Sequence, residues 1–367
     1  MPYFLLSLLI FVTPFVINPF GDYFFEPPKV VFVQILVELL LAFFLFGKVN
    51  WRNFNHFQLI LSAILFILTL FQLFLLSIPH SFFGNEVRLQ GIFLLWHLIA
   101  LSLVGSRLDV SQLPKVLFPV CLFFLLLSSF LVEPDTNGRA IGTLGEANAL
   151  ASSAIFYWPL ALVLKLKDRD KILKSGILFT ALIIILLSGS RSGMLAFLIQ
   201  IIFILICKWL GLKKAVILSF LFILFSLTLP FIQGGGWFEN RAEIWQTAIF
   251  AGSGEILGNA FGNIEQALFE ASEKLNNNVR FQAVDSAHNF LLDFWVQGGI
   301  IGLSVVVLLI FLSLRRLIKN KKTLELAAFL GLITVLLFNP ASVATLVVFW
   351  FLIGQGFKGI HYNWPKV

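Results

Sequence analysis

Long apolar runs, repeated from one end of the chain to the other, most limit what this sequence can fold into. Each run holds about 15–22 residues, the length at which an α-helix crosses a hydrocarbon core of ~30 Å. Only 12% of the 367 residues are charged, whereas a soluble domain carries about 25%. The sequence therefore predicts an all-α integral membrane protein with about twelve transmembrane helices, near residues 3–18, 29–47, 57–78, 89–105, 114–132, 147–164, 172–188, 193–209, 214–232, 288–314, 324–338 and 342–357.

The last two runs leave two arrangements open. The eleventh run is short, and Asn339-Pro340 separates it from the twelfth. Proline ends a helix because it lacks an amide donor and its ring meets the preceding turn. Either both runs cross the bilayer fully or they pair as a hairpin. Both arrangements leave the two chain termini on the same side.

The basic residues predict which side that is, because cytoplasmic loops are rich in Lys and Arg. With the N-terminus inside, 19 of the 26 Lys and Arg residues fall in inner loops and 7 in outer ones. We therefore expect a multi-pass protein of a cytoplasmic membrane with both termini in the cytoplasm. The seven outer residues are Lys29, Arg88, Arg139, Arg191, Arg241, Lys274 and Arg280.

The longest hydrophilic segment, residues 233–287, lies between the ninth and tenth runs and is predicted to face outside. Apolar residues recur there at helical spacing, among polar neighbours. This pattern predicts a short amphipathic helix at the membrane surface, so the segment forms a small helical loop domain. The residues of the predicted apolar stripe are Phe238, Ala242, Trp245 and Ile249.

Several classes of function find no support. The sequence has no CxxC or HExxH motif and five scattered histidines, so we expect neither a metal nor another cofactor. Cys121 and Cys207 lie in apolar runs and are predicted to be inert. The net charge of +7 reflects the topological bias and does not indicate nucleic-acid binding. Met1 begins an uncleaved first span, because no cationic n-region or cleavage pattern follows.

Two outer arginines are the best candidates for binding an anion, since arginine grips phosphate with a planar fork. Arg191 lies in the turn Ser188–Gly193, where a new helix begins and supplies a positive helix end. Arg241 stands one helical turn before Trp245. The simpler alternatives are that Arg191 reaches toward headgroups, that Arg241 anchors the surface helix, or that either residue pairs with an outer acid.

His288 is the best candidate for a base. It begins the tenth run, where Asp285 or Ser286 can cap the helix, and the positive helix end keeps the imidazole neutral. The alternative is a capping or interfacial histidine. Asp293, one turn further on, is placed to orient it or to pair with the arginines. Gly299 and Gly302 lie on the same helical stripe and are predicted to allow close helix packing.

These residues match a known pattern. His288-Asn289, nine residues, and then Gly299-Ile300-Ile301-Gly302 resemble the signature of the bacterial O-antigen ligase and O-antigen polymerase superfamily. The chain departs from it at Leu303, where the ligase form has Gly, Thr or Tyr. Further segments that resemble the family surround Arg88, Arg139, Arg191 and Arg241, and residues 257–263 resemble a loop that usually reads L-G-x-G-x-x-N.

The resemblance implies a GT-C-like membrane glycosyltransferase that works without a metal. Its donor is a glycan on undecaprenyl diphosphate, and its acceptor is a lipid, another lipid-linked glycan or a protein hydroxyl. Arg191 and Arg241 would hold the diphosphate and His288 would act as the base, or else help to hold the diphosphate. Supporting roles would fall to Arg88, Arg139, Arg280, Asn289 and Asp293. The related core would be residues 176–312, between helical regions 1–175 and 313–367.

A transporter or flippase of lipid-linked sugars or of small anions is the competing interpretation. A carrier is expected to place polar or discontinuous helices near the middle of the bilayer. The candidate residues here gather at the outer boundary instead, which favours an enzyme.

Overall fold

The computed structural model describes residues 1–21, 23–46, 54–76, 81–164, 170–232, 241–282 and 284–358. Helices joined by loops make up this part of the chain, which contains no strand. The helices are α1 (Pro2–Ser7), α2 (Glu26–Phe46), α3 (His56–Phe71), α4 (Ile92–Gly105), α5 (Leu117–Leu131), α6 (Ala147–Ala161), α7 (Asp170–Ser188), α8 (Arg191–Leu210), α9 (Leu212–Ser226), α10 (Leu229–Ile232), α11 (Arg241–Gly252), α12 (Ile264–Leu275), α13 (Phe290–Lys319), α14 (Thr323–Leu336) and α15 (Val343–Gly356).

Helices lie at each of the predicted apolar runs, which confirms an all-α membrane fold with several spans. Within the described ranges, six helical segments are long and apolar enough to cross a bilayer. Others are shorter: α4, α5, α6, α14 and α15 have 14 or 15 residues, about 21–23 Å by helical rise. Twelve full crossings therefore remain a prediction. The six long segments are Glu26–Phe46, His56–Phe74, Asp170–Ser188, Arg191–Leu210, Leu212–Phe231 and Phe290–Lys319.

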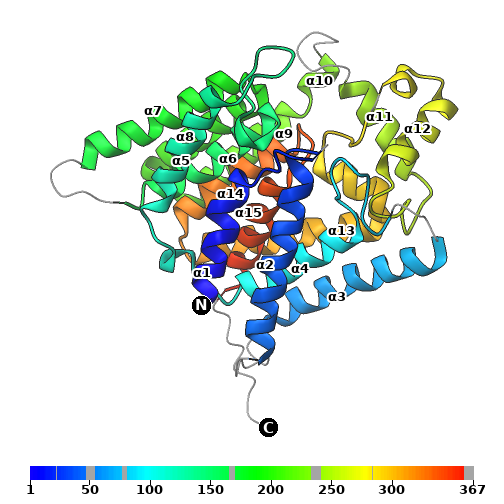
Figure 1. The fold of residues 1–367 in the computed structure, drawn as a ribbon, viewed down its shortest axis with the longest axis horizontal. Helices are drawn as coiled ribbons and strands as arrows, with labels where there is room; N and C mark the ends of the chain where they lie inside the picture. The colour runs from blue at the N-terminus through cyan, green and yellow to red at the C-terminus, as the bar shows by residue number, and fades with distance from the viewer. Residues whose placement is uncertain are drawn as a thin grey trace.

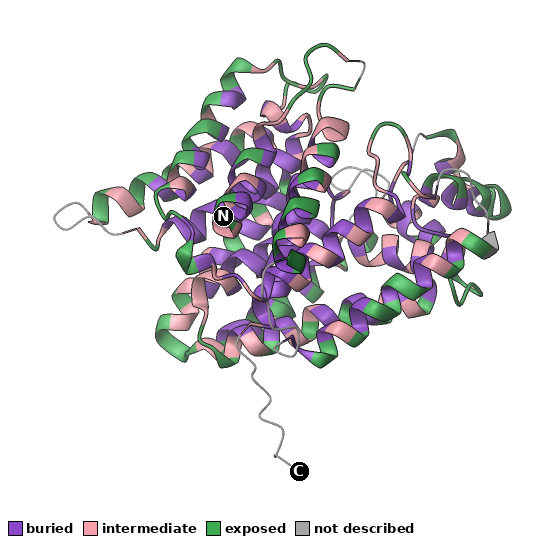
Figure 2. Ribbon diagram, turned by 60° about the horizontal axis from the view of Figure 1, so that its bottom comes forward, coloured by how far each residue is buried: buried purple, intermediate pink, exposed green. Residues whose placement is uncertain are grey.

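The short helices α14 and α15 lie in the middle of the bundle (Figure 1). Residues 326–339 and 341–357 are buried without interruption, as expected for helices that are apolar all round. The surrounding helices carry the exposed residues, while the interior is buried (Figure 2). The turn at Asn339-Pro340 is thus held inside the protein, with Asn339 only 3% exposed.

The hydrophilic segment that is predicted to lie outside, residues 233–287, contains the α-helices α11 and α12 in its described part. Helix α11 begins at Arg241, and its buried residues include Ile244, Trp245 and Ala248. Of the predicted stripe, Trp245 is buried and Ile249 is 50% exposed, and Phe238 lies outside the described residues. The clearer amphipathic helix is α12, which the sequence analysis did not predict. It buries Ile264, Ala267, Leu268, Ala271 and Ser272 at helical spacing.

The long helix α13 is broken at Gly299, which has φ +59° and ψ −161°. The sequence analysis placed Gly299 and Gly302 on one continuous stripe from His288, and this continuity does not hold. A Cβ on Gly299 would lie 2.3 Å from the Ile256 carbonyl oxygen. The glycine therefore admits the backbone of the outer loop. Gly302 lies further along and faces Leu68 of α3 at an ordinary 3.6 Å.

Candidate functional site

His288 lies in a tight turn just before α13. Asn289 caps the helix, and its side-chain oxygen accepts from the amides of Leu291 (3.0 Å) and Leu292 (3.2 Å). Neither Asp285 nor Ser286 is the cap, contrary to the sequence analysis. His288 has φ +53°, a left-handed conformation that is uncommon for a residue other than glycine. Its side chain is half-buried.

Asp293 holds this turn in place. Its carboxylate accepts hydrogen bonds from the Ser286 hydroxyl (2.9 and 3.1 Å) and from the Ala287 amide (2.7 Å). The Ser286 oxygen in turn accepts from the His288 amide at 3.0 Å. The carboxylate also lies in the first turns of α13, where the helix dipole favours a negative charge. Asp293 therefore fixes the backbone from which His288 projects.

Arg88 ties the turn to α6. Its Nε donates to Asp285 at 2.5 Å and its Nη2 to Glu146, which precedes α6, at 3.2 Å. Burial alone would lower the pKa of Arg88, but the two carboxylates outweigh it and the pKa is raised. The guanidinium is thus permanently charged and already engaged with two acids.

Arg191 is the exposed first residue of α8. Ser190 caps this helix by accepting from the Gly193 amide at 3.2 Å, and its hydroxyl donates to Asn148, on α6, at 2.8 Å. The predicted helix start is confirmed. Arg139 lies across the same turn, since a Cβ on Gly189 would approach its side chain to 3.3 Å.

Arg139 and Arg280 have other partners in this structure. The Arg139 Nε donates to Asp135 at 2.7 Å. Burial would raise the pKa of Asp135, but hydrogen bonds from Arg139 and Asn137 lower it overall. Arg280 belongs to the outer segment, where its guanidinium stacks on Phe281, 4.7 Å from the ring centroid.

The turn between α14 and α15 connects these parts. Phe338 packs against Trp245 of α11, with ring centroids 5.9 Å apart, and the Asn339 amide donates to the Ser192 hydroxyl next to Arg191. The Ala341 carbonyl accepts from Gln90 at 2.8 Å. Residues 338–341 therefore contact both α8, next to Arg191, and α11, one turn after Arg241.

Six helices begin in this region: α2, α4, α6, α8, α13 and α15. Glu26 joins the first and last of them by accepting from the Val343 amide at 2.9 Å. The bonds of Gln90, Arg88 and Ser190 connect the others. Each helix start carries a partial positive charge. The region thus combines positive helix ends and arginines with the carboxylates of Glu26, Glu146, Asp285 and Asp293, which Arg88 and nearby backbone amides already bond.

A small cavity of about 50 Å³ lies beneath this group, lined among others by Arg88, Asp285, Asp293 and Pro340. That volume suits only one or a few water molecules. The cavity is therefore too small to hold a glycan. Among the residues the structure describes, no cluster of three or more His, Cys, Asp or Glu side chains could hold a metal ion.

A comparison with known protein families gives a match for part of the chain. Residues 176–307 match the family model described as O-antigen ligase. Over these residues the chain is similar to the O-antigen ligase and polymerase superfamily. The match suggests an activity like that of a membrane glycosyltransferase of the ligase or polymerase type. No curated protein matches the chain.

The loop at residues 257–263, which resembles a superfamily segment, favours glycine where its backbone has a positive φ. Gly258, Ala260 and Gly262 all have positive φ, and Ala260 stands where the superfamily usually has glycine. The loop is bonded to the break in α13. Gln72, just after α3, donates to the carbonyls of Leu257 (2.6 Å) and Gln297 (2.8 Å).

Sequence reasoning missed several of these residues. Glu26 and Gln72 lie outside the segments that resemble the superfamily. Gln90 lies within one of them but was given no role, and Asn339 was considered only as part of a helix break. Their signal was a polar side chain within or beside an apolar run, where such a group is costly and needs a partner. The sequence does not show which partner each residue has.

Proposed function

We propose that this protein transfers a glycan from undecaprenyl diphosphate to an acceptor hydroxyl at the outer face of the cytoplasmic membrane, with inversion and without a metal. The observation that carries the proposal is the gathering of six helix starts next to Arg191 and Arg241. A lipid diphosphate is the leaving group in such a transfer. Its developing charge requires fixed positive groups, which helix starts and arginines supply without reorganising.

Arg191 is the residue best placed to meet the diphosphate, because it is exposed and begins α8. Arg241 begins α11 and approaches from the outer segment. Arg88 has a different part in this proposal. Since it already pairs with Asp285 and Glu146, it holds the turn of His288 against α6 instead of meeting the donor.

His288 deprotonates the acceptor hydroxyl in this proposal. The proton moves from the acceptor oxygen to the imidazole, while the bond between the sugar and the diphosphate breaks and the lipid diphosphate leaves. The turn bonded by Asp293 and Ser286 fixes the direction of the imidazole. Attack from the face opposite the leaving group inverts the anomeric carbon.

The test compares His288→Ala with the wild type in vesicles that contain a lipid-linked glycan and an acceptor. General-base catalysis is worth about 10²–10⁴-fold, so transfer falls by that order while donor binding survives. Activity of the wild type falls as the pH drops through the histidine pKa. A collapse of donor affinity in His288→Ala would instead assign His288 to the diphosphate. Addition of EDTA leaves transfer unchanged.

One observation favours transport as a second candidate. The break at Gly299 lies nine residues into α13, about 14 Å along the helix, and broken helices near the middle of the bilayer are typical of carriers. However, the freed carbonyls are already bonded: Gln297 to Gln72 at 2.8 Å and Val296 to Asn259 at 2.9 Å. A flippase would move lipid-linked glycan across vesicles without any acceptor, and the enzyme would not.

A further inference from the structure

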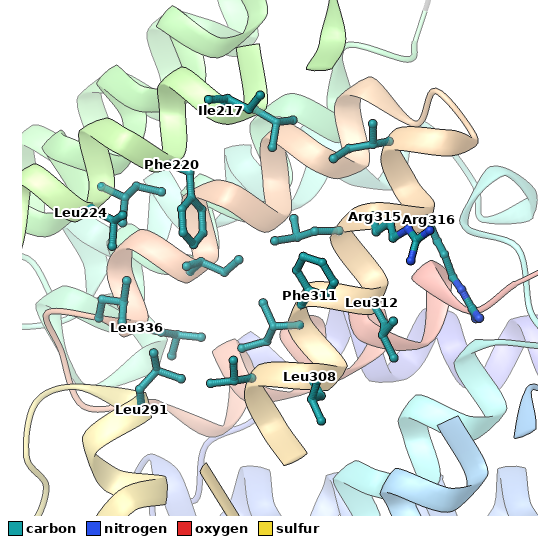
Figure 3. A pocket seen from close by; sticks show the side chains of 18 of the residues that line it. Ile217, Phe220, Leu224, Leu291, Leu308, Phe311, Leu312, Arg315, Arg316 and Leu336 are labelled. Carbon is teal, nitrogen blue, oxygen red and sulfur yellow. The ribbon is translucent and has the colours of Figure 1, made fainter. Parts of the chain in front are cut away.

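A groove of about 1430 Å³ runs along the bundle between α9 and α13, and one of its ends, at Phe290 and Leu291, adjoins the site described above (Figure 3). We call it the lateral groove. Its walls are apolar: Phe220 and Leu224 come from α9, Leu308 and Phe311 from α13, and Leu336 from α14. Many of these side chains are exposed, Leu308 to 46%. The groove is therefore open from the side that faces the bilayer.

One end of the lateral groove is basic. Lys213, at the start of α9, lines it together with Arg315 and Lys319, at the end of α13. No acidic residue is among the lining residues. Within the described part of the chain, these three cations form no ion pair. The nearby Arg316 also lines the groove, and its guanidinium stacks on Phe357 at 4.6 Å from the ring centroid.

Three cations from two helices repel one another unless an anion lies between them. The apolar walls extend from this end for a useful length: from Lys213 to Leu227, α9 rises about 21 Å. Half of a ~30 Å hydrocarbon core is about 15 Å. The groove thus has the dimensions and polarity of one phospholipid, with a charged head and a long apolar body.

We propose that the lateral groove binds an anionic phospholipid. Its phosphate lies between Lys213, Arg315 and Lys319, and its acyl chains lie along α9 and the second half of α13. Basic pockets between membrane helices hold anionic headgroups in this way. The arginine can grip the phosphate through two donors, whereas each lysine contributes a point charge.

The competing occupant is the isoprenoid chain of a polyprenyl phosphate. Its phosphate would lie at the opposite end of the groove, near Leu291, because that end is next to Asn289 and the candidate site. The two occupants therefore depend on different basic residues. An anionic phospholipid needs Lys213, Arg315 and Lys319, whereas a polyprenyl phosphate would be indifferent to them.

The experiment measures lipid binding to the purified full chain in detergent by native mass spectrometry, with phosphatidylglycerol and phosphatidylcholine as probes. The test variant combines Lys213→Gln, Arg315→Gln and Lys319→Gln. The matched control combines Lys115→Gln, Lys171→Gln and Lys208→Gln, which removes the same charge from exposed positions outside the groove. Each basic residue near a headgroup is worth about fivefold, so the test variant binds phosphatidylglycerol more weakly by on the order of a hundredfold. The control retains it.

A second variant, Leu308→Trp, fills the groove without changing its charge, and it also reduces phosphatidylglycerol binding. Melting temperatures of all variants report whether the bundle remains folded. The proposal is overturned if phosphatidylcholine binds as tightly as phosphatidylglycerol, or if the test and control variants bind equally. It is also overturned if undecaprenyl phosphate displaces phosphatidylglycerol and binds the test variant as tightly as it binds the wild type.

Discussion

The arginines around the site differ in how exposed they are. Arg88 contacts two carboxylates, at 2.5 and 3.2 Å, and Arg139 contacts Asp135 at 2.7 Å. Arg191 instead extends from the start of α8 as an exposed residue. In the sequence the three cannot be told apart, because each is an arginine in a predicted outer loop. The partners of Arg88 and Arg139 indicate that these two organise the site, and the exposure of Arg191 leaves it accessible to a ligand.

We expect Arg191→Ala to lower transfer about tenfold or more, because a hydrogen bond to a charged group is worth about 1.5–3 kcal/mol. Arg191→Lys restores part of this activity, since it keeps the charge but loses the fork. Steady-state transfer at varied donor concentration measures both effects. Lys274→Ala, which removes an exposed outer charge from α12, is the control. Full transfer in both Arg191→Ala and Arg241→Ala would show that the diphosphate binds elsewhere.

At the scale of elements, the loop at residues 257–263 and the break in α13 form one unit. A Cβ on Gly258 would lie 2.3 Å from the Gln297 carbonyl oxygen, and one on Gly299 would lie 2.6 Å from the Gly258 amide nitrogen. Each glycine is therefore required by the backbone of the other segment. The contact therefore requires both the loop at residues 257–263 and the break in α13 to adopt their observed backbone conformations.

This contact predicts that substitutions at Gly258 and Ala260 change the free energy of unfolding by very different amounts. Gly258→Ala lowers the free energy of unfolding by about 3 kcal/mol or more, because it adds a clash to a left-handed residue. Ala260→Gly changes it by less than about 1 kcal/mol. Relief of about 1–2 kcal/mol of strain is offset by about 0.4–1 kcal/mol for the freer unfolded chain and about 0.8 kcal/mol for the lost buried methyl.

Thermal unfolding of the two variants in detergent, compared with the wild type, measures the difference. A melting temperature of Gly258→Ala equal to that of the wild type would mean that the two backbones do not approach this closely. Ala260→Gly serves as the matched control, because it changes the same chemical group in the same loop at a position that already accommodates a methyl.

The sequence was informative where structure is local and uninformative where it depends on distant partners. The start of α8 follows from Ser190 and the glycines around it, and apolar runs placed the helices because lipid requires such runs. The cap of α13 was wrong by three or four residues, since Asp285 is drawn to Arg88 and Ser286 to Asp293. The break at Gly299 depends on residues 255–258, and local spacing contains no sign of that contact.

At the scale of the whole molecule, the orientation in the membrane remains a prediction of the 19:7 distribution of basic residues. We expect residues 188–193 and 233–287 outside, and 165–174 and 315–322 inside. α13 connects the two sides, since it begins beside the outer segment and ends at Lys319. Residues 165–169, 233–240 and 283 lie outside the described ranges.

Labelling by a membrane-impermeant maleimide tests this orientation. Cys121 and Cys207 are first replaced by serine, and single cysteines are then introduced by Glu273→Cys on α12 and Asn320→Cys after α13, both at exposed positions. In intact cells the first is labelled, and the second is labelled only after the membrane is opened. The reverse pattern would place the site in the cytoplasm and contradict the proposed reaction.

The central position of α14 and α15 has a consequence for how the protein is made. These two helices form the middle of the bundle, yet the ribosome synthesises them after all the helices that enclose them. Until they emerge, the enclosing helices lack part of their buried contacts. The Gln200 side chain can already bond the Ile155 carbonyl at 2.9 Å, but its bond to the Ala327 carbonyl, also 2.9 Å, forms only with α14. The enclosing helices therefore reach their final packing only when α14 and α15 insert among them.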